Sequence, residues 1–464
     1  MRRLIVVSNR VNPPKDAHVG TTGGLAMALA AALREYSGIW FGWSGRTVEA
    51  STGQLSIDRT GGVTVATIDL EPQDIQEYYN GYANRTLWPL FHYRMDLTAY
   101  ERSFDAGYER VNMRFADALH PLIEPDDVIW VQDYHLMLLG RELRRRGLDN
   151  RIGFFLHIPW PAQRIFTTLP GHQELVAALM DYDLIGFQTD EACEAFADYI
   201  THCPDGSADA DGVVRAFGKT SRIGAFPIGI DVPEFDAALQ SPAAADYTRR
   251  MKASAAGRKM ILGVDRLDYS KGLEERFVAY EQMLADDPGL SEQVFLLQIA
   301  PPSRDAVDTY QDLRARLDTV NGRINGAHAT VEWVPIRYVN RTYRRDELAG
   351  IYRAADVGLV TPLRDGMNLV AKEYVAAQDP EDPGVLVLSE FAGAAAQLEA
   401  ALIVNPMSRE DVAEAIRRAL SMPVAERRER WGALIGSVRG DCVTKWRDSF
   451  VDALNAQDAS PAAA

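Results

Sequence analysis

Cysteine is scarce in this chain of 464 residues, which has only Cys193, Cys203 and Cys442. Three scattered cysteines are too few for a disulfide framework or a zinc site. Long apolar runs are missing too, because the longest membrane candidate, LAMALAAAL from Leu25, has nine residues, whereas a spanning helix needs about 20. The segment before Ser8 has too few apolar residues for a signal peptide. These absences predict a soluble, cytoplasmic protein with reduced thiols.

An excess of positive charge is also missing. The 65 acidic residues outnumber the 49 basic ones and the net charge is −16, which disfavours nucleic acids and anionic membranes as partners and leaves room only for a local basic pocket. The sequence contains no GxGxxG, P-loop, GxSxG or HExxH motif, and no carboxylate pair after a strand that would hold a divalent metal. We therefore expect neither a metal nor a cofactor.

Short apolar runs alternate with helical patterns from one end of the chain to the other. This alternation predicts βαβ units and parallel sheets, and the continuous apolar runs are typical of strands buried on both faces. The length suggests two domains. The predicted fold class is therefore α/β, with two Rossmann-like, doubly wound domains over 1–235 and 236–439, a cleft between them, and a disordered tail over 458–464.

Six strand-like runs follow one another in the second predicted domain, at 259–267, 294–302, 330–337, 356–362, 384–390 and 401–406. Ser408 and Asp411 have the spacing of a capping box, which predicts the start of a helix. Residues 204–212 have the composition of an exposed loop. In Leu359–Ala377 a strand, a charged turn and a helix follow one another, so Asp365 and Glu373 either cap and solvate that helix or hold a ligand.

Charged and polar residues follow several predicted strands, which is where doubly wound domains bind ligands. Arg10, Arg266, Lys271 and Arg304 each stand at such a strand end. Because a planar guanidinium grips a phosphate with two hydrogen bonds, these cations predict a phosphate-bearing ligand. The alternative is four surface cations in salt bridges.

Three further candidates have both a functional and a structural interpretation. Gly23 and Gly24 precede a predicted helix, where backbone amides favour an anion, or they form a plain turn. Asp133 follows the run VIWV as a candidate acid, or it caps the next helix. His157, at the end of GFFLH, is a candidate imidazole or a satisfied core histidine.

Nine stretches carry a family resemblance in chain order: SNR at Ser8, GGL at Gly23, WFGWSG at Trp40, YYNGYANRTLWPLFHYR at Tyr78, WVQDYHLML at Trp130, GFFLHIPWP at Gly153, FPIGID at Phe226, VDRLDYSKGL at Val264 and VTPLRDGMNLVAKEYVAAQ at Val360. Together they resemble the trehalose-6-phosphate synthases, glycosyltransferase family 20, and they span nearly the whole chain. The resemblance implies a GT-B fold, in which two Rossmann-like domains face each other across a central cleft. It also implies that a final helix, at about 440–457, crosses back to the first domain.

The resemblance further implies a reaction in which UDP-glucose and glucose 6-phosphate give α,α-trehalose 6-phosphate and UDP. The implied mechanism is retaining, front-face and independent of metal. Catalytic roles would fall to Asp133, His157, Arg266, Lys271 and Asp365. The acceptor would be held by Arg10, Tyr79, Trp88, Asp133 and Arg304. The donor would be held by Gly23, Gly24, His157, Arg266, Lys271, Tyr343, Asp365, Gly366, Met367, Asn368, Leu369, Val370 and Glu373.

Two alternatives stay open at this point. One is a sister glycosyltransferase that uses another nucleotide-glucose, or another phosphorylated acceptor such as glycerol 3-phosphate. The other is a non-catalytic regulatory subunit on the same fold, although such a subunit should have lost the charged site residues that are present here. The expected partners are small-molecule substrates, with no nucleic acid and no membrane, and a homo-oligomer, either dimer or tetramer, is left open.

Overall fold

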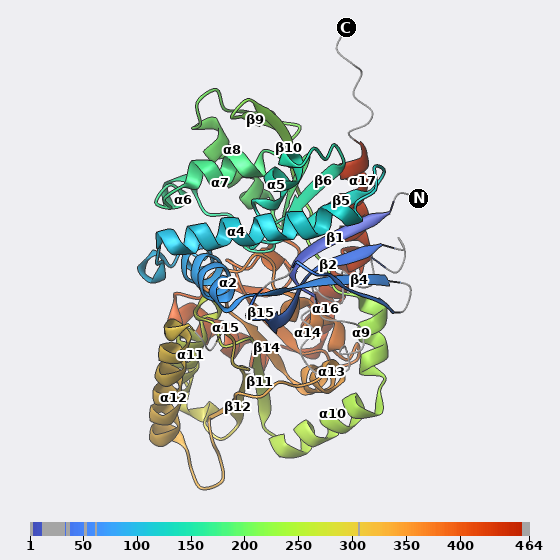
Figure 1. The fold of residues 1–464 in the computed structure, drawn as a ribbon. Helices are drawn as coiled ribbons and strands as arrows, with labels where there is room; N and C mark the ends of the chain where they lie inside the picture. Colours follow the sequence, from blue (N-terminus) through green and yellow to red (C-terminus); the bar gives the residue numbers. More distant parts are fainter. Residues whose placement is uncertain are drawn as a thin grey trace. The chain divides into compact units, whose positions relative to one another are not determined.

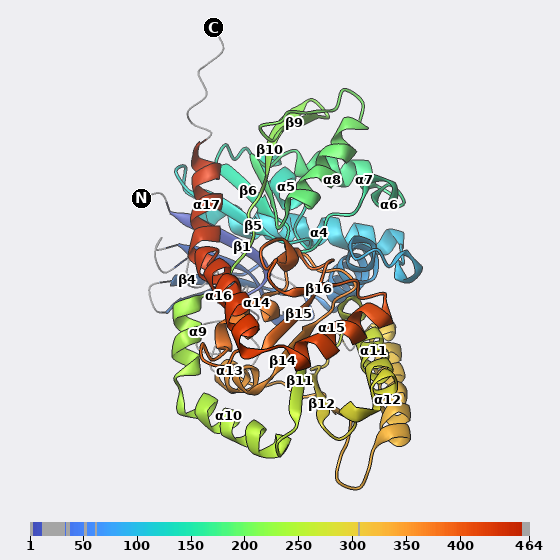
Figure 2. The same cartoon turned by 180° about the vertical axis from the view of Figure 1, so that it is seen from behind.

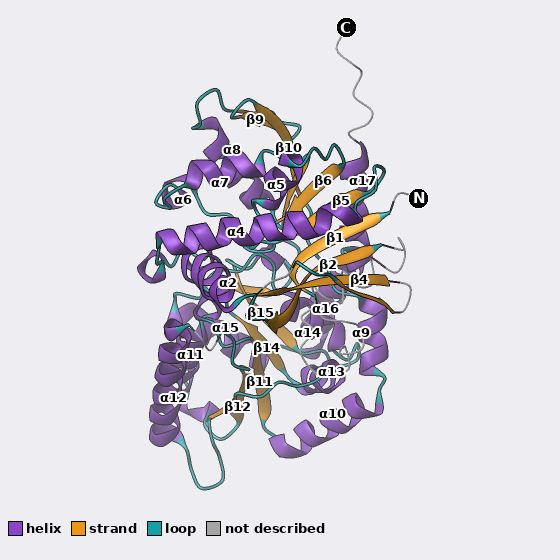
Figure 3. Cartoon of the chain, in the orientation of Figure 1, coloured by secondary structure: helices purple, strands orange, loops and turns teal. Residues whose placement is uncertain are grey.

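The structure, a computed structural model, describes residues 3–11, 33, 38–50, 53–60, 63–304 and 307–456. These residues divide into two compact units. The described residues up to 228 form the first unit together with residues 444–456, and residues 229–443 form the second. Each unit combines one main sheet with flanking helices (Figure 3). Gly23, Gly24 and the tail over 458–464 lie outside the described residues.

Ten strands build the sheet of the first unit: β1 (Leu4–Arg10), β2 (Ile39–Thr47), β3 (Ser56–Thr60), β4 (Val63–Leu70), β5 (Val128–Gln132), β6 (Arg151–Phe155), β7 (Leu184–Phe187), β8 (Ser207–Ala208), β9 (Val213–Ala216) and β10 (Lys219–Ala225). Their order is β3-β4-β2-β1-β5-β6-β7-β10-β9-β8. The strands from β4 to β10 in this order run parallel, and antiparallel pairs extend both edges. The chain changes direction across the sheet between β1 and β5, which makes this pair the topological switch point.

The helices of the first unit are α2 (Pro72–Asp74), the π-helix η2 (Ile75–Leu87), α3 (Trp88–Phe91), the 3-10 helices η3 (Met95–Leu97) and η4 (His120–Leu122), α4 (Arg102–Leu119), α5 (Leu139–Arg145), α6 (Gln163–Phe166), α7 (His172–Leu179), α8 (Asp190–Thr201) and α17 (Val443–Asn455). Helices α4 and α17 cover opposite faces of the sheet (Figures 1 and 2). The ring of Phe450 on α17 stacks on Trp130 at 4.7 Å. Glycine at positions 153 and 186 admits this ring, because a Cβ atom there would lie 2.7 and 2.6 Å from it.

Six strands build the sheet of the second unit: β11 (Lys259–Val264), β12 (Val294–Ile299), β13 (Ile336–Val339), β14 (Val357–Val360), β15 (Val385–Ser389) and β16 (Leu402–Val404). Their order is β13-β12-β11-β14-β15-β16 and every pairing is parallel. The order of strands reverses between β11 and β14. This is the arrangement of a doubly wound nucleotide-binding sheet, so the predicted α/β class is confirmed.

The helices of the second unit are α9 (Val232–Leu239), α10 (Pro242–Ala255), η5 (Tyr269–Lys271), α11 (Leu273–Asp286), η6 (Pro288–Leu290), α12 (Asp308–His328), α13 (Arg345–Ala354), α14 (Leu369–Ala377), η7 (Gly393–Ala396), α15 (Arg409–Ser421) and α16 (Val424–Gly440). Helices α11, α12 and α15 cover one face of the sheet, and α10, α13 and α14 cover the other (Figures 1 and 2). At the start of α15 the Ser408 side chain accepts a hydrogen bond from the Asp411 amide at 3.1 Å, which confirms the predicted helix start.

Two predicted segments differ in detail. The strand expected over 330–337 begins only at Ile336, because the Thr330 amide donates to the carbonyl oxygen of Trp333 at 2.9 Å and closes a turn before it. In the expected loop over 204–212, Ser207 and Ala208 form the short strand β8, which pairs with β9. Among the helices that the structure describes, none combines the length and the apolar character needed to cross a bilayer.

Candidate active site

Two loops meet at the switch point of the second unit, one after β11 and one after β14. Lys271, at the end of the first loop, places its Nζ 2.5 Å from the Oδ2 atom of Asp365 in the second. The Leu363 amide also donates to the carbonyl oxygen of Ser270 at 2.8 Å. The structure therefore brings together Lys271 and Asp365, which are 94 positions apart in the chain.

Asp365 is held from several sides. Its Oδ2 atom also accepts a hydrogen bond from Asn368 Nδ2 at 3.0 Å. Its amide donates to the carbonyl oxygen of Phe391 at 3.0 Å, and its own carbonyl oxygen accepts from the Gly393 amide at 3.1 Å. Its carboxylate thus stays at the carboxyl end of the sheet, close to the ammonium group of Lys271.

Asn368 caps α14, and the interpretation of Asp365 as the cap is wrong. The Asn368 side chain accepts from the Ala371 amide at 3.2 Å, and its backbone has a left-handed φ of 93°. Leu369 and Val370 follow as the first two residues of the helix. Gly366 and Met367 form the buried turn before the cap. Amides at such a helix start favour an anion.

A buried arginine that the sequence did not single out supports the loop after β11. Arg276 on α11 has a fully enclosed side chain and forms an ion pair with Asp265 at 2.7 Å. It also donates to Gln298 Oε1 at 2.8 Å and to the carbonyl oxygen of Lys271 at 3.3 Å. Its charge gave no signal in the sequence, because charged residues are frequent along a helix with one solvated face.

Arg304 and Arg266 have different environments in the second unit. Arg304, which has a left-handed φ of 55°, forms an ion pair with Asp268 at 3.0 Å, and its side chain is 6% exposed. Arg266 follows β11 and is exposed. Lys271 and Arg304 thus form ion pairs, but these lie largely enclosed at the strand ends rather than on the open surface that the alternative expected.

Two predicted donor residues lie along the helices on one side of this sheet. On α14, Glu373 accepts a hydrogen bond from the Tyr352 hydroxyl at 3.3 Å, and burial raises the pKa of its carboxyl group, with Arg345 acting in the opposite direction. Tyr343 precedes α13, and its ring lies 6.0 Å from that of Tyr247 on α10. None of the contacts in the described part of the chain joins Tyr343 to Glu373.

At the switch point of the first unit, Arg10 ends β1 and Asp133 follows β5. Arg10 is exposed, and its guanidinium carbon lies 5.7 Å from the ring centre of Trp43. Asp133 has a left-handed φ of 74°, and its Oδ1 atom accepts from the His157 amide at 3.2 Å. Because α5 begins only at Leu139, Asp133 does not cap it, and that alternative is wrong.

His157 lies in a row of polar side chains at the ends of β5, β6 and β7. Its Nε2 lies 2.8 Å from Gln132 Oε1, and its Nδ1 lies 3.3 Å from Gln188 Nε2. The first contact needs a proton on Nε2, and the second needs a lone pair on Nδ1, so the partners define a neutral imidazole. Burial lowers the pKa of His157 to about 3. It is a satisfied, uncharged histidine at the strand ends, with both ring nitrogens engaged by glutamine side chains.

Aromatic rings form a continuous wall beside Arg10 in the first unit. Ring centres lie 6.0 Å apart for Trp43 and Tyr79, 5.9 Å for Tyr79 and His135, 4.0 Å for His135 and Tyr134, and 5.6 Å for Tyr134 and Trp88. Tyr79 projects from the π-helix η2, a rare element that often marks functional sites. Trp43, Trp88, Tyr134 and His135 are buried, and Tyr79 is the partly exposed ring of this wall. Trp43, Tyr134 and His135 were not predicted as site residues, although all three stand in stretches that carry the family resemblance.

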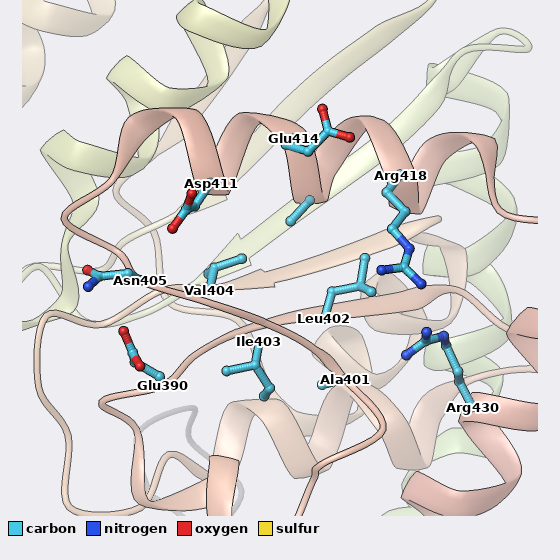
Figure 4. Close-up of a pocket in the computed structure, with 11 residues that line it drawn as sticks. Glu390, Ala401, Leu402, Ile403, Val404, Asn405, Asp411, Glu414, Arg418 and Arg430 are labelled. Atoms are coloured by element: carbon cyan, nitrogen blue, oxygen red, sulfur yellow. The ribbon is translucent and has the colours of Figure 1, made fainter.

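A separate pocket of about 520 Å³ lies between β16 and α15 (Figure 4). Its charged and polar lining comes from Glu390, Asn405, Asp411, Glu414, Arg418 and Arg430. None of the predicted site residues lines it, so we assign it no part in the site. In the described part of the chain, no cluster of three or more His, Cys, Asp or Glu side chains has the arrangement of a metal site.

The chain is similar to known proteins over nearly its whole length. A model of glycosyltransferase family 20 matches residues 3–456. A trehalose-6-phosphate synthase from Sinorhizobium fredii is 48% identical over 458 residues, which cover 98% of this chain and 99% of the relative. Two solved structures also match over nearly their full lengths. One is a UDP-forming α,α-trehalose-phosphate synthase from Burkholderia xenovorans in complex with glucose-6-phosphate, with 50% identity, a TM-score of 0.94, and coverage of 98% of this chain and 100% of that one.

The second structure comes from E. coli and is bound with UDP-2-fluoro glucose; it has 46% identity, a TM-score of 0.92, and coverage of 97% of this chain and 98% of that one. With two Rossmann-like units and a polar switch point in each, the fold is that of a GT-B glycosyltransferase. The chain belongs to glycosyltransferase family 20.

Proposed function

We propose that the chain transfers glucose from UDP-glucose to glucose 6-phosphate and releases α,α-trehalose 6-phosphate and UDP. The observation that carries this proposal is the buried contact between Lys271 and Asp365 at the switch point of a doubly wound sheet. One unit thus offers a cation for a diphosphate and a carboxylate for sugar hydroxyls at the place where such sheets bind nucleotides.

The donor roles follow from the chemistry of each group in the second unit. Lys271, with Arg266 and the amides at the start of α14, would neutralise the diphosphate. Asp365 would accept hydrogen bonds from hydroxyls of the transferred glucose. Glu373, four positions into α14, would accept from the ribose, because its carboxylate is oriented by Tyr352.

The acceptor roles combine a stacking surface with phosphate-binding cations. In the first unit, Tyr79, the partly exposed ring of the aromatic wall, would pack on the acceptor sugar together with an edge of Trp88, and Arg10 would bind its phosphate. In the second unit, Arg304 is proposed as a ligand of the acceptor phosphate. Asp133 would orient an acceptor hydroxyl and His157 a hydroxyl of the transferred glucose.

The reaction breaks the bond between the anomeric carbon and the oxygen of the UDP β-phosphate. Negative charge then grows on the departing UDP, and fixed cations with oriented amides in a partly desolvated site stabilise it. The acceptor hydroxyl forms the new bond on the same face of the sugar, and its proton passes to the departing phosphate. Retention through a covalent intermediate would instead need a carboxylate nucleophile. We do not assign that role to Asp365, whose Oδ2 atom is already engaged by Lys271 and Asn368.

Substrate choice is tested by pairing donors with acceptors. Purified protein is incubated with UDP-, ADP- or GDP-glucose, each with glucose 6-phosphate or glycerol 3-phosphate, and nucleotide release and product are measured. We expect turnover with UDP-glucose and glucose 6-phosphate, an α,α-linked product by NMR, and the same rate in excess EDTA.

Each arm of this experiment tests one part of the proposal. No turnover with any glucose 6-phosphate pairing would refute the assigned reaction, and a preference for glycerol 3-phosphate would favour the sister enzyme. An inverted linkage would refute retention. A rate that EDTA abolishes and Mg²⁺ restores would refute metal independence.

A further inference from the structure

One buried carboxylate, Asp268, serves two loops of the second unit. It is fully buried. Its Oδ1 atom accepts from the Ser270 amide at 3.0 Å and caps the 3-10 turn η5, which ends at Lys271. Its Oδ2 atom accepts from Arg304 Nη1 at 3.0 Å and from the Tyr310 hydroxyl at 3.2 Å. The turn that presents Lys271 and the ion pair that holds Arg304 therefore depend on the same side chain, that of Asp268.

Tyr310, on helix α12, also contacts Arg304. Its hydroxyl oxygen accepts from Arg304 Nη1 at 2.5 Å, and the arginine also lies over its ring at 5.5 Å. Tyr310 is 2% exposed, and burial raises the pKa of its hydroxyl, which keeps the proton that it donates to Asp268. Asp268 and Tyr310 thus both engage the Nη1 atom of Arg304.

The backbone of Arg304 shows that this position is imposed by its surroundings. Its φ of 55° lies in the left-handed region, which a residue with a side chain rarely adopts. Such a conformation persists when the surrounding contacts determine it, and it is frequent at ligand-binding sites. The turn η5 and helix α12 are also in direct contact, since the rings of Tyr269 and Tyr310 lie 5.3 Å apart.

We propose that Asp268 and Tyr310 are positioning residues that couple binding of the acceptor phosphate at Arg304 to binding of the donor diphosphate at Lys271. This inference rests on the proposed function, because the two ligands are those assigned above. Whichever ligand binds first restrains the shared carboxylate and the turn it caps, so the second ligand meets a site that is already ordered. Each substrate then raises the affinity of the protein for the other by the same factor, as linkage requires.

The coupling is measured by calorimetric titration of UDP in the absence and presence of saturating glucose 6-phosphate. In the wild-type protein we expect glucose 6-phosphate to raise the affinity for UDP by about fivefold or more, the lower end of typical couplings between sites. In Tyr310→Phe, which removes only the hydroxyl, we expect less than a twofold effect and an unchanged affinity for UDP alone. Asp268→Asn, which keeps the shape but removes the charge, should also lose the coupling.

Tyr280→Phe is the matched control. Tyr280 lies buried on α11, and its hydroxyl donates to the carbonyl oxygen of Val294 at 3.4 Å, away from Asp268 and Arg304. A purely structural role for Tyr310 would lower the melting temperature of both Tyr→Phe variants and leave the coupling factor intact. That result would overturn the proposal, as would a coupling factor near one in the wild-type protein. If Asp268→Asn does not fold, Tyr310→Phe decides.

Turnover of the wild-type protein separates this inference from the proposed function. Product formation from UDP-glucose and glucose 6-phosphate together with an unchanged coupling in Tyr310→Phe would refute the coupling role alone. Coupled binding without any product would instead refute the proposed reaction and leave the coupling standing.

Discussion

Lys372 lies on α14, next to the proposed ribose ligand Glu373, and replacing it by methionine should change how stability depends on pH. It is 1% exposed, and its Nζ donates to Gln397 Oε1 at 2.6 Å. Gln397 in turn donates to Asp441 at 2.7 Å. Burial lowers the pKa of Lys372 from 10.5 to about 8, although the charge of Asp441 acts in the opposite direction.

The direction in which the free energy of unfolding changes with pH follows from proton binding in the folded and unfolded states. Below pH 8 both states carry the proton, and the folded protein bears the full cost of a buried charge. Between pH 8 and 10.5 the unfolded chain holds the proton that the folded protein has lost, so the free energy of unfolding rises with pH. At about 1.4 kcal/mol per unit of pKa, the gain over this window is about 3 kcal/mol.

Urea unfolding at several pH values between 7.5 and 10.5 measures this gain in wild type and in Lys372→Met. Other titrating groups act equally in both proteins and cancel in the difference. Across this pH range we expect the free energy of unfolding of the wild type to rise by about 3 kcal/mol relative to that of the variant. Lys252→Met, at an exposed lysine of α10, should track the wild type. Parallel curves for wild type and Lys372→Met would refute the reasoning.

Three further predictions concern catalysis and stability. Arg304→Ala should raise KM for glucose 6-phosphate by about tenfold or more, the loss of one charge-assisted hydrogen bond, whereas Lys271→Ala should mainly lower kcat; equal effects of both variants on acceptor affinity in steady-state assays would contradict these roles. Because the pKa of His157 is about 3, the ratio of wild-type to His157→Gln rates should stay constant from pH 5 to 8, and a ratio that changes near pH 6.5 would show a titrating imidazole. Phe450→Ala should cost about 3 to 5 kcal/mol in denaturant unfolding, since its buried ring packs on Trp130; a loss below about 1 kcal/mol would argue against this packing.

The fold class and the positions of the site loops could be predicted because their signals are local. Continuous apolar runs such as LIVV mark strands buried on both faces, and β1 covers the predicted Leu4–Arg10. Parallel strands present their carboxyl ends at one edge of a sheet, so polar residues after β11 and β14 could be expected to meet. Lys271 and Asp365 do so.

Features that depend on contacts between distant segments could not be predicted. The left-handed backbones of Asp133 and Arg304 are imposed by partners 24 and 36 positions away. A π-helix is rare and its spacing differs from the period of about 3.6 residues that indicates an α-helix, so the placement of Tyr79 on η2 gave no signal. Asn368, which the sequence did not single out as a cap, caps α14, whereas the carboxylate of Asp365 is engaged by Lys271 from a loop 94 positions away.

The return of the chain to the first unit has a consequence for synthesis on the ribosome. Residues 229–443 emerge as one uninterrupted stretch, and every strand of their sheet is available before the last helix is made. The first unit begins earlier, but Trp130, Gly153 and Gly186 lack their covering ring until Phe450 has been added. Domains generally fold as units during translation. It follows that the half of the protein translated first is the half completed last.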